Sequence, residues 1–115
     1  MSIHSSIHGE IFIVQPTGDI NMQVAVEFES LLTVAIEDGF ENIVFDFSAT
    51  HQISSDGLHV ILRIIRIFNS KNGIVIAADM NASVRSVFDA SGFMSLLNVC
   101  DTVEEAIHAI NDDAN

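Results

Sequence analysis

Two short apolar runs, each followed by a helical pattern, constrain the fold of this chain most strongly. Ile43 to Phe47 and Ile74 to Ala78 are nearly continuous apolar segments, which is typical of strands buried on both faces of a sheet. Residues 58–68 and 81–90 follow them with apolar residues at helical spacing. Because a helix between two strands usually joins parallel neighbours by a right-handed crossover, this pattern predicts an α/β fold with a parallel sheet.

The N-terminal half adds a hairpin and a further helix. Ile3 to Ile7 and Ile11 to Gln15 flank His8-Gly9-Glu10, so we expect two antiparallel strands and hence a mixed sheet. The cluster Pro16-Thr17-Gly18-Asp19 predicts a turn. Met22 to Asp38 then reads as a helix, with Asn21 as its N-cap and Gly39 as its stop.

The C-terminal part is expected to hold a weaker strand and a last helix. Leu96 to Val99 is the candidate strand, and the helix is expected to start at Thr102, where Thr102 and Glu105 fit a capping box. We therefore predict a mixed, mostly parallel sheet of four to five strands with about four helices.

The length and the sequence pattern favour one domain over residues 1–115. The 49% hydrophobic content suffices for one packed core, and we find no internal repeat and no low-complexity linker. The single cysteine, Cys100, excludes an intrachain disulfide. The start MSIHSSIHGE lacks the pattern of a signal peptide, and no apolar run approaches the ~20 residues of a membrane span. A cytoplasmic location is the resulting expectation.

The chain is strongly acidic, and its net charge indicates which classes of partner it can bind. Sixteen acidic against four basic side chains give a net charge of −12, which repels nucleic-acid phosphates and anionic lipid surfaces. We expect no nucleic acid and no direct membrane insertion. A basic patch on a partner protein is the better complement.

The sequence gives little support for a catalytic site or a metal site. His4 and His8 have no third ligand nearby in the sequence, whereas zinc sites need at least three protein ligands. General acid–base use of His51 or His59 would need a nucleophile and an orienting acid nearby, and the sequence does not show that proximity. Asp46 suggests a receiver-type phosphoacceptor, but such a site needs an acid cluster after the first strand and a late lysine, and the only lysine is Lys71. The sequence also lacks a glycine-rich phosphate loop. We therefore expect that the protein binds no cofactor and is not an enzyme.

Chemistry concentrates in I-S-S-D-G, residues 53–57, just before a helix. Free N–H groups and the helix dipole favour a hydroxyl or a carboxylate there, so Ser55 or Asp56 is explained as a cap. The same N–H groups would hold a phosphate, so a serine at this place is also a candidate for a reversible switch.

The helix after this motif is apolar on more than one stripe. Val60, Ile64 and Ile67 lie off the face formed by Leu58, Ile61, Leu62 and Ile65. The second stripe is either covered by neighbouring elements or exposed for a partner. We expect the first.

Several motifs together resemble one family. G-D-I-N at 18–21, I-V-F-D-F-S at 43–48, S-S-D-G-L at 54–58 and V-R-S-V-F-D-A-S-G-F at 84–93 resemble STAS domains, the anti-sigma factor antagonists of bacteria. The resemblance runs from about Gly9 to Ile110.

The resemblance implies a non-enzymatic switch. Such proteins bind a serine kinase of histidine-kinase-like ATPase fold that doubles as an anti-sigma factor, are phosphorylated by it, and are restored by a PP2C-type phosphatase. The family's usual motif is D-S-S-G-L, whose second serine accepts the phosphate. Aligned on Gly57 and Leu58, this chain has Ser54 at the family's acid, Ser55 at its first serine and Asp56 at the phosphoacceptor.

An aspartate at the phosphoacceptor position allows two alternatives for partner binding. Its permanent charge either mimics the phosphorylated form or leaves the protein permanently available to its partner, and Ser55 or Ser54 is an alternative acceptor. The partner-binding residues that the resemblance implies are Asp19, Asn21, Ser54, Ser55, Asp56, Gly57, Leu58 and His59. The alternative function is a STAS subunit that assembles with a membrane lipid or anion transporter without phosphorylation.

Overall fold

A five-stranded sheet forms the centre of the computed structural model, which describes residues 3–92 and 94–113. Its strands lie in the order β1-β2-β4-β6-β7: β1 Ile3–His8, β2 Ile11–Pro16, β4 Asn42–Asp46, β6 Ile74–Ala78 and β7 Asn98–Cys100. β1 pairs with β2 antiparallel, and the other three pairs are parallel. The predicted mixed, mostly parallel sheet is confirmed.

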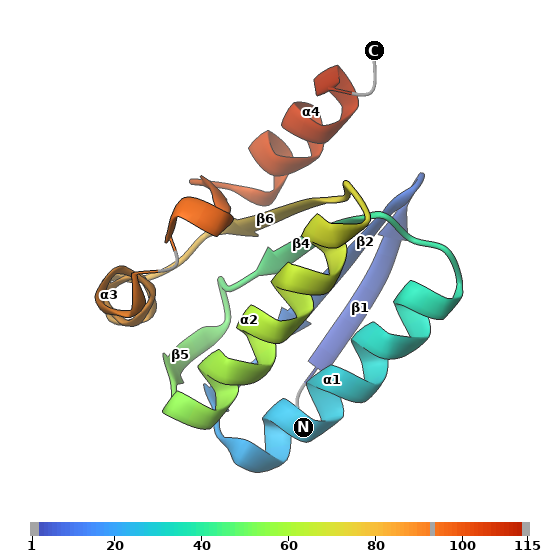
Figure 1. The fold of residues 1–115 in the computed structure, drawn as a ribbon. Coiled ribbons are helices and arrows are strands. Elements are labelled where there is room, and N and C mark those ends of the chain that lie inside the picture. The colour runs from blue at the N-terminus through green and yellow to red at the C-terminus, as the bar shows by residue number, and fades with distance from the viewer. Residues whose placement is uncertain (1–2, 93, 114–115) are drawn as a thin grey trace.

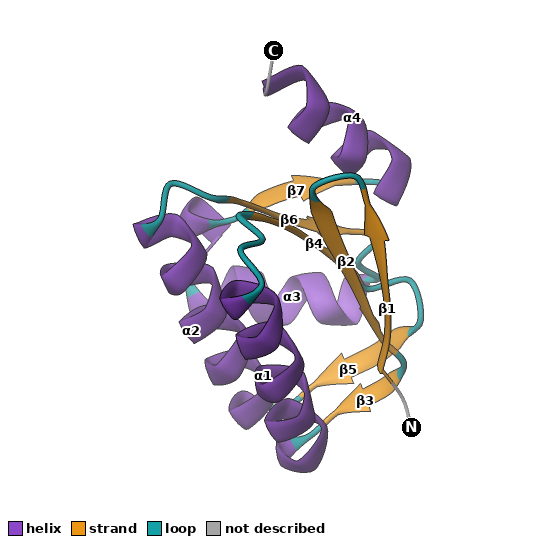
Figure 2. Cartoon of the chain, turned by 90° about the vertical axis from the view of Figure 1, so that its right-hand side faces the viewer, coloured by secondary structure: helices purple, strands orange, loops and turns teal. Residues whose placement is uncertain are grey.

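Within residues 3–92 and 94–113, four helices cover the two faces of this sheet. They are α1 Met22–Glu37, α2 Ser55–Ser70, α3 Ala82–Ser91 and α4 Val103–Asp113. Figure 2 shows α1, α2 and α3 on one side of the sheet and α4 on the other. In the described part of the chain, no helix is long and apolar enough to cross a membrane.

The central strands are buried on both faces, as their sequences predict. Ile43 and Phe45 of β4 belong to the larger core beneath α1, α2 and α3. Val44, between them, belongs to a smaller core with Ala106 and Ile110 of α4. Because neighbouring side chains of a strand point to opposite faces, one apolar run supplies both cores.

The second apolar stripe of α2 is covered by neighbouring elements, as expected. Val60 is 6% exposed and Ile64 only 1%, and Ile67 is half-buried. α1 packs alongside α2, and an ion pair joins Arg63 to Glu29 at 3.1 Å (Figure 1). The second stripe therefore packs against neighbouring elements and does not form an exposed apolar surface for a partner.

A second, two-stranded sheet was missed by the sequence analysis. β3 (Gly18–Ile20) and β5 (Thr50–Ile53) pair in parallel. The prediction that residues 16–19 form only a turn is therefore wrong from Gly18 onward. The N–H of Gly18 donates to the carbonyl of Ala49 at 2.8 Å, and the buried hydroxyl of Thr50 donates to the carbonyl of Pro16 at 2.9 Å. These contacts between distant segments form a strand too short to show a sequence period.

Helix ends follow the sequence well, with local corrections. Asn21 caps α1, and Gly92 ends α3 in the left-handed region, where glycine carries no Cβ penalty. The hydroxyl of Thr102 accepts from the N–H of Glu105 at 3.1 Å, as the capping box predicts. The predicted strand at 96–99 is displaced, because Met94–Leu96 forms a 3₁₀ turn and the strand is Asn98–Cys100.

Candidate functional site

The starts of α1 and α2 lie side by side because the strands before them are paired. β3 leads into α1 and β5 into α2, and Ile20 stands opposite Ile53 in the parallel register. The N–H of Ser54 donates to the carbonyl of Ile20 at 2.9 Å. Asp19 of β3 and Asn21, the residue before α1, are thereby fixed beside the start of α2. Both helices begin at the same end of the molecule (Figure 1).

The start of α3 is attached to the same region. Its cap, Asn81, accepts from the N–H of Val84 at 2.8 Å, while its amide nitrogen donates to the carbonyls of Thr50 at 3.0 Å and His51 at 3.3 Å. Asn81 thus joins α3 to β5. The carboxyl ends of parallel strands, where helices begin, are the usual location of sites in α/β folds.

Ser54 is the N-cap of α2, which corrects the interpretation of Ser55 or Asp56 as the cap. The backbone of Ser54 is extended, with φ −77° and ψ 167°, and its hydroxyl accepts from the N–H of Gly57 at 3.1 Å. Ser55 and Asp56 are the first two residues of the helix, and both are exposed. An acid in the first turn is still stabilised by the helix dipole, by about 0.3–1 kcal/mol.

Gly57 allows the close approach of α2 to the end of β3. A Cβ at this residue would lie 2.7 Å from Cγ2 of Ile20 and 2.9 Å from its carbonyl oxygen. Gly57 is buried although it stands in the first turn of a surface helix. The glycine that follows Asp56 therefore has a packing reason that is independent of any partner.

The structure brings the eight predicted partner-binding residues to one region with graded exposure. Asp19, Asn21, Ser55, Asp56 and His59 are exposed, Ser54 and Leu58 are half-buried, and Gly57 is buried. Leu58 packs against the larger core. Five of the eight residues therefore have side chains that can touch a partner without any rearrangement, and the other three are partly or fully buried beneath them.

Two apolar side chains at this surface were not identified from the sequence. Met22 and Val26, in the first turns of α1, are 55% and 56% exposed. They stand four residues apart, which places them on one face of the helix. Their positions in the sequence lie off the buried face of α1, and this could have identified them as exposed apolar residues. Exposed His51 and Gln52 of β5 belong to the same end of the molecule.

Beyond its first turn, α2 carries cationic side chains. His59, Leu62, Arg63 and Arg66 line a hollow of about 410 Å³. Arg63 also contacts the carboxylate of Glu29, as described above. Since the chain has a net charge of −12, the two arginines make this part of α2 more basic than most of the chain.

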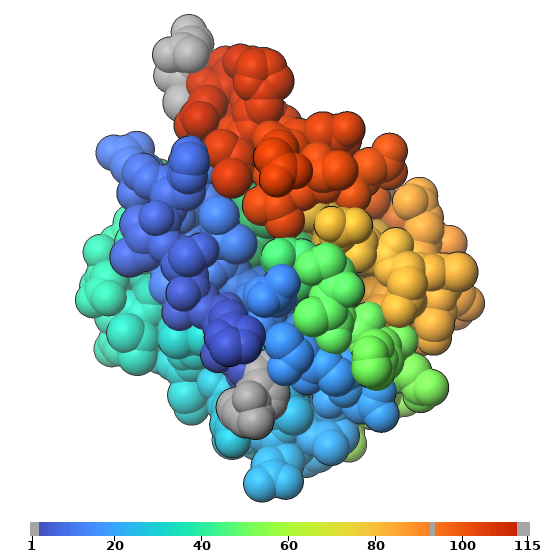
Figure 3. Space-filling model, turned by 180° about the vertical axis from the view of Figure 1, so that it is seen from behind, coloured from blue at the N-terminus to red at the C-terminus, as the bar shows by residue number. Residues whose placement is uncertain are grey.

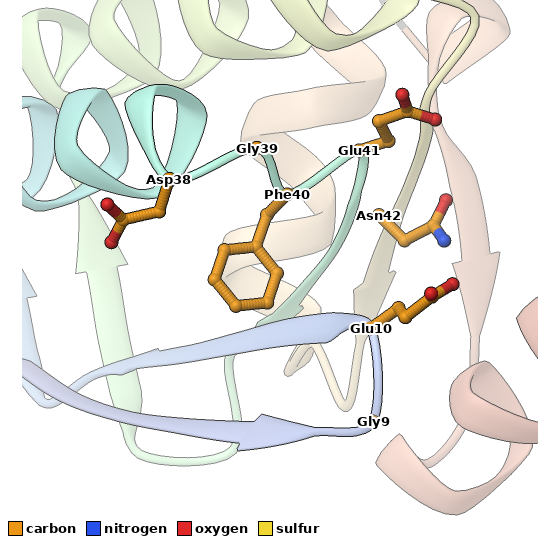
Figure 4. Close-up of a pocket in the computed structure, with 7 residues that line it drawn as sticks. All are labelled: Gly9, Glu10, Asp38, Gly39, Phe40, Glu41 and Asn42. Atoms are coloured by element: carbon orange, nitrogen blue, oxygen red, sulfur yellow. The ribbon is translucent and has the colours of Figure 1, made fainter.

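A second hollow, of about 370 Å³, lies at the start of β2 and β4, away from the beginning of α2. Figure 4 shows Phe40 in the middle, with Asp38 on one side of the ring and Glu10 and Glu41 on the other. The carboxylate of Asp38 points away from those of Glu10 and Glu41, which both extend to the other side of Phe40. Among the described residues, no group of three or more His, Cys, Asp or Glu side chains could hold a metal ion.

Comparison with known proteins identifies the family. A model of the STAS domain matches residues 2–106. The chain belongs to the STAS domain family.

Relatives of this STAS domain cover most of its length. BtrV of Bordetella bronchiseptica, named as a candidate anti-sigma factor antagonist, is 30% identical over 80% of this chain and 79% of its own. An anti-sigma F factor antagonist of Paenibacillus polymyxa is 25% identical over 93% and 92%. The crystal structure of TM1081 from Thermotoga maritima superposes with a TM-score of 0.89 over 95% and 94% of the two chains, at 22% identity. This last likeness supports the fold.

Proposed function

We propose that this STAS domain is a non-enzymatic module of bacterial partner switching that binds an anti-sigma factor. The observation that carries the proposal is the paired start of α1 and α2. The contact of Ile20 with Ser54 and Gly57 holds exposed Asp19 and Asn21 beside exposed Ser55 and Asp56. The relatives named as anti-sigma factor antagonists support the class of partner.

The partner that fits this surface is a serine kinase of histidine-kinase-like ATPase fold with a basic and partly apolar docking face. Asp19 and Asp56 add to the acidic surface, so cationic side chains on the partner are the electrostatic complement. Met22 and Val26 offer apolar area next to them. Burial of such side chains supplies affinity, while the charges favour association and register.

Asp56 stands at the position that the family uses for phosphate, and we propose that it leaves the domain permanently available to its partner. A phosphoserine carries about −1.5 to −2 charges and three acceptor oxygens, whereas an aspartate carries one charge on a shorter side chain. Asp56 is exposed in the first turn of α2, where the dipole accommodates one charge. A partner with cationic groups can therefore dock over it.

Ser55 is the alternative phosphoacceptor in this proposal. It is exposed and is the first residue of α2. Its side chain leaves the helix about 100° from that of the next residue, so a kinase aligned for the usual position would meet Asp56 instead. A PP2C-type phosphatase has a role here only if Ser55 or Ser54 is phosphorylated.

Titration calorimetry with a cognate anti-sigma factor of histidine-kinase-like ATPase fold tests the proposal. We expect the wild type, Asp56→Ser and Asp56→Ala to bind with dissociation constants within about tenfold of one another, a difference of about 1.4 kcal/mol. Glu104→Ala removes an exposed carboxylate from α4, on the opposite face of the sheet, and is the matched control. Absence of binding in all four proteins would refute the partner class and favour the transporter subunit.

Incubation with the same kinase and ATP, followed by mass spectrometry, tests the role of position 56. We expect no phosphate on the wild type and one phosphate on Asp56→Ser, whose binding should then be lost. Phosphate on Ser55 or Ser54 of the wild type would show that the switch is retained at another residue and would contradict permanent availability.

A further inference from the structure

The outer edge of β1 offers a second surface, separate from the start of α2. In the described part of the chain, β1 pairs with β2 on one side and stands at the end of the strand order. Residues 4–8 are all exposed, and Figure 3 shows β1, in dark blue, uncovered on the surface. An open edge presents unpaired N–H and C=O groups to any strand that can approach.

This edge lacks the devices that usually prevent pairing. The sequence of β1, I-H-S-S-I-H, contains no proline, lysine or acid in a chain of charge −12. Its register with β2 runs without a bulge from Ile3 to His8. A second copy of the chain would be repelled by the net charge of −12, but β1 itself brings no carboxylate to the contact.

The register determines which backbone groups point outward. His8 and Ile11 flank the two-residue turn Gly9-Glu10 and therefore form a hydrogen-bonded pair. Since such pairs alternate along an antiparallel ladder, Ser6 and His4 also point their backbone groups toward β2. The N–H and C=O groups of Ile3, Ser5 and Ile7 then point away from the sheet.

An exposed isoleucine gives this edge one preferred pairing. Ile7 is 63% exposed although it lies opposite Phe12, a member of the larger core. If Ser5 faces Ser5 of a second copy in antiparallel orientation, Ile7 faces Ile3 of that copy and the exposed side chain is covered. This register uses all three outward residues and forms about six backbone hydrogen bonds.

We propose that two copies of this domain associate through antiparallel pairing of their β1 strands, centred on Ser5, into one continuous sheet. The starts of α1 and α2 take no part in this contact. The association weakens at low ionic strength, because the two copies carry the same large charge and salt screens their repulsion.

Disulfide trapping tests the register directly. In a Cys100→Ala background, Ser5→Cys is expected to cross-link under mild oxidation, because facing residues of a hydrogen-bonded pair stand about 5.5 Å apart between Cα atoms. Ser6→Cys is the matched control, since Ser6 would face His4 of the second copy and lie beyond about 7 Å from its own counterpart. Equal cross-linking of both variants, or cross-linking of Ser6→Cys alone, would overturn the proposal.

Sedimentation equilibrium of the uncross-linked chain gives the second readout. We expect a dimer that strengthens between about 0.05 M and about 0.5 M salt, and a loss of affinity of about tenfold or more in Ser5→Pro and Ile7→Lys. Ala90→Lys, an equal charge change on α3 at the other side of the molecule (Figure 1), should leave the affinity unchanged. A chain that stays monomeric at every salt concentration, or a dimer indifferent to Ser5→Pro and Ile7→Lys, would refute it.

Discussion

Gly57 of α2 lies so close to Ile20 of β3 that a Cβ on the glycine would stand 2.9 Å from the carbonyl oxygen of Ile20. Alanine normally stabilises a helix relative to glycine by about 0.5–1 kcal/mol. Here Gly57→Ala should instead lower the free energy of unfolding by about 1–3 kcal/mol, because α2 must move away from β3. Urea denaturation monitored by circular dichroism measures the change. An unchanged or raised stability would show that this contact is not tight.

The cap of α2 is Ser54, so its removal should cost more than removal of its neighbour. Ser54→Ala deletes the acceptor for the N–H of Gly57 and should lower the free energy of unfolding by about 1 kcal/mol. Ser55→Ala, at an exposed first helical residue, should stay within about 0.5 kcal/mol of the wild type. The reverse order of the two effects would contradict the assignment of the cap.

Asn81 should contribute more to stability than the equivalent cap Asn21. Both accept from a helix N–H, Asn81 from Val84 and Asn21 from Val24. Asn81 also donates to the carbonyls of Thr50 and His51. We expect Asn21→Ala to cost about 1 kcal/mol and Asn81→Ala about 2 kcal/mol. Equal losses in thermal or urea unfolding would mean that the bridge to β5 adds nothing.

The thiol of Cys100 should react slowly in the folded protein. Burial raises the pKa of Cys100, and the carboxylates of Glu105 and Asp101 raise it further. Since the thiolate is the reactive form, alkylation by iodoacetamide at pH about 8.5 should be slower in the native than in the urea-unfolded chain. Glu105→Gln should accelerate the native reaction while it keeps a side-chain oxygen near the N–H of Asp101. Equal native and unfolded rates would contradict the raised pKa.

The same raised pKa has a consequence for stability at alkaline pH. The unfolded chain loses the Cys100 proton at a lower pH than the folded chain does. The stability of the fold should therefore decrease as the pH rises above the ordinary pKa of a thiol. Comparison of urea unfolding at neutral and alkaline pH, with Cys100→Ser as control, measures this; the control should lose less stability than the wild type.

The sequence predicts the parts of this fold that depend on local patterns. The apolar runs at Ile43 and Ile74, the cap Asn21 and the capping contact of Thr102 with Glu105 are all confirmed. These features are determined by residues within a few positions of one another, so they can be identified without tertiary contacts.

The features that were missed depend on contacts between distant segments. β3 exists because Gly18 and Ile20 meet Ala49 and Ser54, which lie about thirty residues further along the chain. The cap at Ser54, instead of Ser55 or Asp56, follows from the same contact, since the N–H of Ser54 is held by β3 in an extended backbone. The exposure of Met22 and Val26 depends on where α2 packs against α1.

The most direct test of the proposed function is an NMR titration of the isotope-labelled domain with the kinase-fold anti-sigma factor. We predict that backbone resonances of residues 19–26 and 54–59 shift or broaden, while those of α4, on the opposite face of the sheet, stay in place. Changes confined to α4 or to β1, or an unchanged spectrum at saturating partner, would contradict docking at the paired starts of α1 and α2.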